Sequence, residues 1–231
     1  MSVTGIVAAL TAEARTLGPV RANQINTLAD GSLLLISGMG PQAATRAALA
    51  LVAAGARSLL SFGLAGALDP ALQAGAVLVP AAVTDGTGAV HRTCDVWRER
   101  LDARAGASAQ HHGGTLLSVA QPLMTSSAKS EAWGRTHACA VDMESFAIAS
   151  VAGDRQVNFA VARVVVDTAL DCLPRSVTRA TDSRGELNYA RLLSGLLRSP
   201  AEMLDLLQLA RRYRMAMGSL RQLGQHGLGL S

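Results

Sequence analysis

Three carboxylate residues stand beside apolar runs of strand length in this sequence. Glu13 follows the run 5–10, Glu144 opens a helix-like run, and Asp167 ends the run 159–166. Ligands of open α/β sheets bind at the carboxyl ends of the strands, so we expect these carboxylates at one edge of a sheet. Such a set suits acid–base chemistry on a polyhydroxylated substrate.

The acidic residues near the two later segments also have simpler explanations. Asp142 and Glu144, in Val141-Asp142-Met143-Glu144-Ser145, stand where acidic residues favour the positive end of a helix dipole. Asp167, in Arg163-Val164-Val165-Val166-Asp167-Thr168, could cap a turn. The combination of these segments with Glu13 is what indicates a site.

Two glycine motifs follow strand-like runs. Gly38-Met39-Gly40-Pro41-Gln42-Ala43 matches the dinucleotide fingerprint GxGxxA, but the acidic residue expected about 20 positions later is missing. The motif could also be a tight strand-to-helix turn, or a turn whose amides face an anion or a sugar, and we favour the last. Gly63-Leu64-Ala65-Gly66-Ala67 ends another strand, either as an ordinary loop or as backbone that a ligand approaches closely.

The elements that must position these residues alternate along the chain. Continuous apolar runs predict strands covered on both faces, at 5–10, 33–37, 59–62, 77–82, 116–119 and 159–166. Helix-like runs lie between them, at 42–54, 127–134 and 144–152. The alternation predicts a three-layer α/β/α fold with a mixed, mostly parallel central sheet.

The last part of the chain has a different pattern. From residue 184 onward the apolar residues fall on helical periods, with a break at Ser199-Pro200 and a frayed end over 223–231. We predict a single domain over residues 1–231, in which residues 178–231 form a helical C-terminal extension.

Composition excludes several classes of protein. The chain has 231 residues, 49% hydrophobic and 16% charged, with a net charge of +4, which excludes a disordered chain. No apolar stretch reaches the roughly 20 residues that cross a bilayer, and the first residues do not resemble a secretory signal. Three scattered cysteines predict reduced thiols, and no His/Cys spacing predicts a metal site. Reduced thiols predict a cytoplasmic protein. The arginines are dispersed, so we expect no nucleic-acid partner.

The motifs together resemble those of one enzyme superfamily. GIVAALTAEA, SGMGPQAA, GLAGALDPALQAGAVLVP, VDMES and ARVVVDTA keep the motif order of the nucleoside phosphorylase/nucleosidase superfamily. This superfamily includes purine and uridine phosphorylases and methylthioadenosine/S-adenosylhomocysteine nucleosidases. The likeness runs from about Gly5 to Pro174, and VDMES is its most specific part. The chain looks most similar to the hopanoid-associated phosphorylase branch.

The resemblance implies roles for individual residues. Asp167 matches the aspartate that protonates the leaving purine at N7, and Glu144 matches the carboxylate that binds the ribose hydroxyls. Met143 matches the methionine that packs on the sugar. Substrate-binding positions also include Asp142 beside them, and Gly66 and Ala65 in the second glycine motif. Breaking the N-glycosidic bond creates a cationic sugar, which a nearby carboxylate stabilises.

The resemblance leaves the acceptor open between water and phosphate. Phosphorolytic members carry an arginine and a Ser or Thr where this chain has Ser61 and Leu64, and Glu13 matches the glutamate that activates water in the nucleosidases. These departures favour water. Leu64 and Val166 also depart from the nucleosidase pattern, however, and the amides of Gly38 and Gly40 with an arginine such as Arg46 could still hold phosphate as a co-substrate. We expect no other cofactor.

The hopanoid-associated branch implies a substrate with a very apolar tail. That substrate would be adenosylhopane, from which the enzyme would release adenine in hopanoid biosynthesis. The leucine-rich C-terminal segment also carries basic residues that could lie on the inner membrane, or its leucines could simply pack on the core: Arg198, Arg211, Arg212, Arg214 and Arg221. The family habit implies a homodimer or larger homo-oligomer.

Other functions compete with adenosylhopane hydrolysis. Phosphorolysis would give a ribose 1-phosphate product, and methylthioadenosine/S-adenosylhomocysteine hydrolysis would place the chain in sulfur-nucleoside salvage. A NAD-dependent oxidoreductase rests on GxGxxA alone. A non-catalytic nucleoside- or lipid-binding module would keep the apolar site without releasing base.

Overall fold

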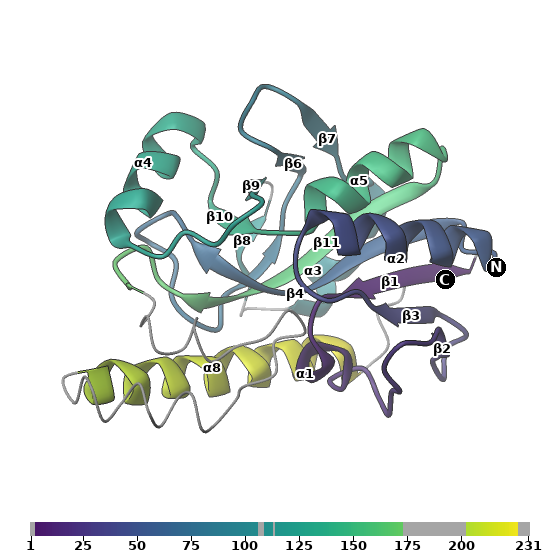
Figure 1. The fold of residues 1–231 in the computed structure, drawn as a ribbon, viewed down its shortest axis with the longest axis horizontal. Helices are drawn as coiled ribbons and strands as arrows, with labels where there is room; N and C mark the ends of the chain where they lie inside the picture. The colour runs from purple at the N-terminus through teal and green to yellow at the C-terminus, as the bar shows by residue number, and fades with distance from the viewer. Residues whose placement is uncertain (1–2, 106–108, 113, 173–201, 226–231) are drawn as a thin grey trace.

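The centre of the molecule is one mixed sheet (Figure 1). The computed structural model describes residues 3–105, 109–112, 114–172 and 202–225. The main path of the sheet is β2 (Asn26–Thr27), β3 (Leu33–Ile36), β1 (Thr4–Ala8), β4 (Ser58–Ala67), β10 (Ala140–Asp142), β9 (Thr115–Ser118), β6 (Ala82–Thr84) and β7 (Val90–Arg92). Beside that path, β11 (Asn158–Asp167) pairs with β4 and with β5 (Val77–Val79), and β5 pairs with β8 (Ala109–His112).

Helices cover both faces of this sheet, as the sequence predicts. In Figure 1, α2 (Pro41–Ala53) and α5 (Ser145–Asp154) lie on one side, and α8 (Glu202–Gln225) and α1 (Thr11–Ala14) lie on the other. The long helix α8 and α3 (Asp95–Ala105) pack on the same strand, β11, while α4 (Ser126–Thr136) stands at one end of the sheet. The fold is therefore the predicted three-layer α/β/α arrangement.

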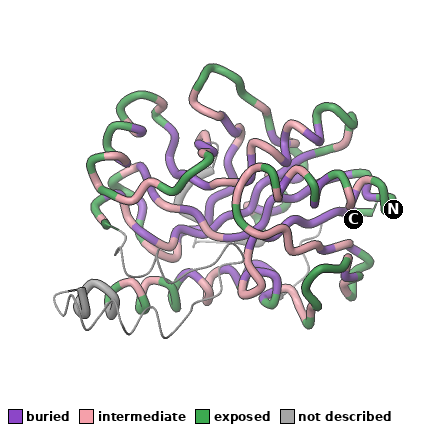
Figure 2. Tube along the Cα trace, in the orientation of Figure 1, coloured by how far each residue is buried: buried purple, intermediate pink, exposed green. Residues whose placement is uncertain are grey.

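Successive residues of the central strands point into two separate cores. Val7 and Val161 pack against α2 and α5, whereas Ile6 and Ala162 join Leu220 of α8 in the other core. Figure 2 shows the resulting buried strands between half-exposed helices. Burial on both faces explains why the strand sequences are apolar without alternation.

Local chemistry sets several element boundaries. Gly40, with a φ of 94°, ends the turn before α2, and Pro41 takes the first helical position, where its missing N–H costs no hydrogen bond. The Thr125 hydroxyl accepts from Ala128 N and caps α4. Pro80 cannot donate to a ladder, so the strand expected at 77–82 is divided into β5 and β6.

Other boundaries differ from the sequence prediction. The expected strand 59–62 is longer and runs through both glycines of the second motif as β4. Four short strands, β2, β7, β8 and β10, and two helices, α1 and α3, were not predicted. The strands have two to four residues, which is too short for a periodicity to show.

The expected C-terminal extension is a layer of the fold rather than an appendage. Ala216, Leu220 and Leu223 of α8 are buried in the core that covers β11. The helix continues to Gln225, beyond the start of the predicted frayed end, and the predicted break at Ser199-Pro200 lies outside the described residues. Within the described part of the chain, no helix has the length and apolarity that crossing a bilayer requires.

Candidate active site

The sheet register brings the predicted site segments together at one edge. β4 lies between β1 and β11, both parallel to it, so that Ala8 is opposite Phe62 and Asp167 is opposite Gly66. Glu13 follows β1, and Asp142 ends β10, which pairs with the last residues of β4. The predicted meeting of Glu13, Glu144 and Asp167 with the second glycine motif is therefore observed.

Glu13 is buried at the start of this edge. Its Oε1 accepts a hydrogen bond from Leu64 N at 2.9 Å, and its Oε2 accepts one from Leu10 N at 2.9 Å. The carboxylate lies directly on the backbone of Gly63, where a Cβ atom would be 2.6 Å from Oε1. Burial raises the pKa of Glu13, while the charge of Arg163 opposes that rise. A raised pKa makes a carboxylate a better proton acceptor than it is in water.

Arg163 is the cation at the centre of the site, and it was not among the site residues predicted from the sequence. Its guanidinium bonds Asp142 Oδ2 at 2.7 Å, Glu144 Oε2 at 3.4 Å and Ser61 Oγ at 2.8 Å. It also donates to Leu64 O at 3.1 Å and to Ser145 Oγ at 3.4 Å. These carboxylates raise the pKa of Arg163 although burial opposes them, so the cation is retained.

Glu144 connects this cluster to the first glycine motif. Its Oε1 accepts a hydrogen bond from Gly40 N at 2.8 Å, and its Oε2 accepts the bond from Arg163. Burial raises the pKa of Glu144 to about 7, against the opposing effect of Arg163. Half-buried Met143 precedes it in the β10–α5 connection.

Asp142 serves mainly to hold the cluster together. Its carboxylate accepts from Ser118 Oγ at 2.7 Å, from the backbone N–H and the hydroxyl of Ser145, and from Arg163. With these partners, Asp142 has little remaining capacity to bind a substrate, and it positions Arg163 and the start of α5 instead.

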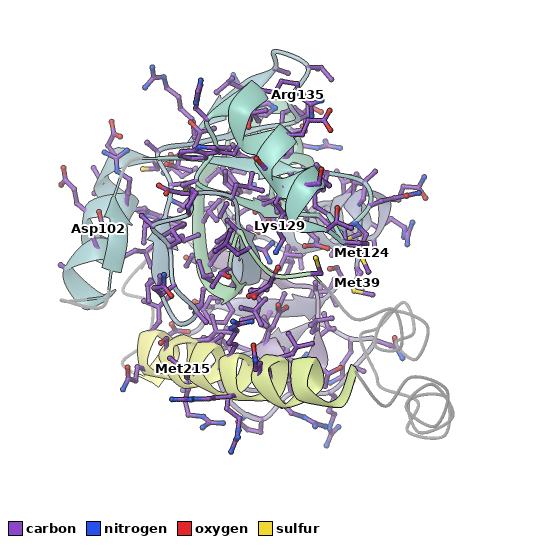
Figure 3. All side chains as sticks on the ribbon, turned by 90° about the vertical axis from the view of Figure 1, so that its left-hand side faces the viewer. Met39, Asp102, Met124, Lys129, Arg135 and Met215 are labelled. Carbon is purple, nitrogen blue, oxygen red and sulfur yellow. The ribbon has the colours of Figure 1, made fainter. Side chains whose placement is uncertain are left out.

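Asp167 stands at the other end of the site beside a second unpredicted cation. The register of β11 against β4 shifts between Val165 and Asp167, and such a bulge redirects the side chains around it. The Asp167 carboxylate pairs with Lys129 of α4, and Lys129 Nζ also donates to Thr168 O at 2.7 Å. Burial raises the pKa of Asp167, and Lys129 opposes that rise. Figure 3 shows Lys129 turned inward from α4.

The glycine motifs support these carboxylates. Gly66 lies against the Asp167 carboxyl group, where a Cβ atom would be 3.2 Å from Oδ1, and Ala65 is buried beside it. Gly38 and Gly40 both have positive φ angles, of 81° and 94°. Because Gly40 N already binds Glu144, this amide of the expected anion site has an anionic partner within the protein.

Both missed cations had a signal in the sequence. Arg163 is a charged residue inside an otherwise apolar strand, and Lys129 is the only lysine of the chain. A buried charge requires a partner, so an arginine in a buried strand predicts nearby carboxylates. The pairing of Lys129 with Asp167 joins residues 38 positions apart and has no local pattern.

Outside these contacts, the described residues line a cavity and form no metal-binding cluster. A cavity of about 210 Å³ lies between β7, α5 and the start of β11, lined by residues such as His91, Cys94 and Phe159, and it contains none of the clustered carboxylates. No group of three His, Cys, Asp or Glu side chains in the described ranges is arranged to hold a metal ion.

Comparison with known proteins identifies the family. Residues 24–198 match the sequence profile of the Phosphorylase superfamily, a range that contains every site segment except Glu13. A comparison with curated protein sequences gives no match. The chain belongs to the Phosphorylase superfamily.

Solved structures share the fold over the full length. A futalosine hydrolase of Helicobacter pylori has a TM-score of 0.67 at 15% identity, with 97% of this chain and 98% of that chain covered. A mutant MTAN of the same organism, with 5′-methylthioadenosine in its active site, has a TM-score of 0.68 at 15% identity, with 98% and 99% covered. The 5′-methylthioadenosine/S-adenosylhomocysteine nucleosidase of Neisseria meningitidis, in complex with methylthio-immucillin-A, has a TM-score of 0.65 at 17% identity, with 98% and 100% covered. The protein is therefore a member of the Phosphorylase superfamily with the fold of these nucleosidases.

Proposed function

We propose that this protein cleaves the N-glycosidic bond of a purine nucleoside and releases the base, with water as the acceptor. One observation carries the proposal. Among the described side chains, the six buried charged residues all belong to the site: Glu13, Lys129, Asp142, Glu144, Arg163 and Asp167. Burial of charges is costly, and a soluble domain retains such a cluster where chemistry requires it.

The cluster has two ends with different chemistry. Glu13, Glu144 and Arg163 form the end that would hold the ribose and the acceptor, where a carboxylate stabilises the positive charge that develops on the sugar. Asp167 and Lys129 form the end that would hold the purine base and supply a proton to it. Met143, which directly precedes Glu144 in the chain, would pack on the sugar.

The charge balance favours water over phosphate. Glu13, Asp142 and Glu144 surround Arg163, so its guanidinium already has carboxylate partners. A phosphate dianion would need a cation of its own for bidentate bonds, and Arg46 is exposed on α2. Glu13, with its raised pKa, is placed to take the proton of an attacking water.

The 5′ substituent of the nucleoside is proposed to be apolar, as in adenosylhopane. Two of the site segments carry exposed apolar residues: Met39 is 36% exposed between Gly38 and Gly40, and Leu170 is 79% exposed after Asp167. Exposed apolar side chains at a site suit an apolar ligand. The alternatives are 5′-methylthioadenosine, which occupies the active site of the similar Helicobacter pylori MTAN, and S-adenosylhomocysteine, a substrate named for the similar Neisseria meningitidis nucleosidase.

The deciding experiment is a base-release assay on purified protein. Adenosylhopane and 5′-methylthioadenosine are incubated separately, with and without phosphate, and free adenine is measured by chromatography. We expect adenine from adenosylhopane without phosphate. Release that requires phosphate would replace hydrolysis with phosphorolysis. Release from methylthioadenosine alone would replace the substrate, and absence of release from any purine nucleoside would favour a binding module.

Contact with a membrane surface through α8 is part of the same proposal. The exposed side of α8 carries Arg211, Arg214 and Arg221 with Met215, a basic face that suits an anionic membrane surface. Such a face would bring a cytoplasmic enzyme to an apolar substrate.

We also propose a homodimer or larger homo-oligomer, which light scattering on the purified protein tests directly.

A further inference from the structure

We infer that Lys129 is a catalytic residue, whose ammonium group donates the proton that the purine base takes up at N7 as the glycosidic bond breaks. This inference rests on the proposed function. It starts from the ion pair of Lys129 with Asp167, the residue that the sequence analysis assigns as proton donor.

The position of Lys129 is the first step of the argument. The side chain is 1% exposed and lies at the base end of the site, close to the beginning of α4. Its ammonium group carries three hydrogens, and the described residues provide two acceptors, the Asp167 carboxylate and Thr168 O. Within the part of the chain that the structure describes, one N–H is therefore left without an acceptor. A buried N–H without an acceptor is costly, and a purine nitrogen would relieve that cost.

The state of Asp167 is the second step. A carboxylate that forms an ion pair with an ammonium group is an acceptor and holds no proton to give. Burial raises the pKa of Asp167 above its usual value, and the charges of Lys129 and Arg212 oppose that rise, while the carboxylate of Asp171 adds to it. In the ion pair the proton is carried by the Lys129 nitrogen, and the Asp167 carboxylate is its acceptor.

The third step is the match between the pair and a purine. Asp167 Oδ1 receives no hydrogen bond from a described residue, and it lies against Gly66, which has no side chain. The pair thus offers an N–H donor next to a carboxylate acceptor. A 6-aminopurine presents the complementary order, an acceptor at N7 next to a donor at the 6-amino group. A 6-oxopurine presents two acceptors and would place its oxygen against the carboxylate.

The step balances as a proton transfer. The electron pair of the breaking C1′–N9 bond passes to the purine, and the proton of Lys129 Nζ passes to N7, so the base leaves neutral. Water adds to C1′ and gives its proton to Glu13. After release, solvent restores the proton to the amine and removes the proton from the carboxyl group.

The test compares leaving groups that do and do not need a proton. Lys129→Met keeps the length of the side chain and removes the charge. It is assayed on a 6-aminopurine nucleoside that the wild-type protein cleaves, 5′-methylthioadenosine or adenosine, and on 4-nitrophenyl riboside, whose anion leaves without protonation. We expect kcat/KM to fall by about 10²–10⁴-fold on the purine nucleoside, the usual range for loss of a general acid, and by less than about tenfold on the nitrophenyl riboside.

A double variant protects the test against misfolding. Lys129→Met leaves the Asp167 carboxyl group buried without its cation, which is destabilising. Lys129→Met/Asp167→Asn removes both charges, and we expect it to keep the wild-type melting temperature within a few degrees and to show the same loss on the purine nucleoside alone. Retained nitrophenyl turnover also shows that the site is folded.

The outcomes separate this inference from the proposed function. Equal losses on both substrates in the double variant, or purine turnover by Lys129→Met close to wild type, would overturn the role of Lys129 and leave the proposed function standing. In the second case Asp167 itself would carry the proton. A wild-type protein that releases base from no purine nucleoside would overturn the proposed function, and this inference with it.

Discussion

The site residues depend on one another because four buried carboxylates share two buried cations. Glu13, Asp142 and Glu144 surround Arg163, and Asp167 pairs with Lys129. In a low-dielectric interior, removal of one partner leaves an uncompensated charge, so a substitution acts on its partners as well. Variants at this scale are therefore best interpreted with a measurement of stability beside the activity.

Asp167→Asn is expected to reduce turnover on a purine nucleoside by about 10²–10⁴-fold, the range for loss of acid catalysis. The amide keeps the size of the side chain but cannot hold the charge of Lys129, and burial disfavours an unpaired ammonium group. Turnover is compared with that of Asp154→Asn, an exposed carboxylate at the end of α5. Adenine release by Asp167→Asn close to wild type would exclude Asp167 from the reaction.

The pH dependence of kcat/KM is expected to show an acidic limb close to neutral pH. Burial raises the pKa of Glu144 to about 7, so its carboxyl group takes up a proton as the pH falls through this value. A protonated Glu144 is a poorer acceptor for ribose hydroxyls and neutralises less positive charge on the sugar, so activity decreases. A profile that stays flat down to pH 5 would show that no group with a raised pKa needs to be ionised.

At the scale of elements, glycines in β4 allow side chains from other strands to lie on its backbone. Gly63 receives the carboxylate of Glu13, and Gly66 receives that of Asp167. The strand continues through both residues because β11 pairs with it along almost its whole length. The glycine-rich end of β4 is thus a surface for buried carboxylates rather than a loop.

Gly63→Ala tests this arrangement. The new Cβ would lie 2.6 Å from Glu13 Oε1, so the carboxylate must move, and we expect turnover to fall by about 10²-fold or more. Gly63 also has a φ of 155°, a conformation that alanine rarely adopts, so the melting temperature is expected to fall as well, and turnover is compared on folded protein. Gly218→Ala is the control, since nothing lies within 4 Å of its Cβ and alanine favours the helix by roughly 0.5–1 kcal/mol. Full activity of Gly63→Ala would contradict a fixed position for Glu13.

The helix α8 is a structural layer, and a core substitution measures its contribution. Leu220 is fully buried between α8 and the sheet. Leu220→Ala is expected to lower the free energy of unfolding by about 2–5 kcal/mol, through lost burial and the cavity left behind. Denaturant unfolding gives this value, with Met215→Ala, which is 50% exposed, as the matched control. Similar small losses in both variants would mean that α8 is only loosely attached.

At the scale of the whole molecule, the outer side of α8 is separate from the site and can be tested without deletion of the helix. We expect the protein to co-sediment with vesicles that contain anionic lipids and to be released by salt, because screened charges attract less. Replacement of Arg211, Arg214 and Arg221 by glutamine, which changes exposed residues only, should weaken this binding and leave adenine release unchanged. Unaltered sedimentation of the triple variant would exclude this face as the anchor.

The sequence predicted the parts of the fold that depend on local patterns. Apolar runs without alternation marked the buried strands, and the alternation of strands with helices indicated the layers, because both follow from which faces of an element are covered. The rule that ligands bind at the carboxyl ends of strands placed Glu13, Glu144 and Asp167 together. Short elements such as β10 lacked enough residues for a period to appear.

Only the tertiary structure decided which charges meet. Arg163 lies among carboxylates that precede it by 19 or more residues, and Lys129 reaches Asp167 from α4. The bulge of β11 and the continuation of β4 through its glycines were also decided at this level. The spacing of apolar residues within an element predicts which of its faces are buried. Ion pairs between elements depend on how distant segments pack, and the local sequence does not encode that packing.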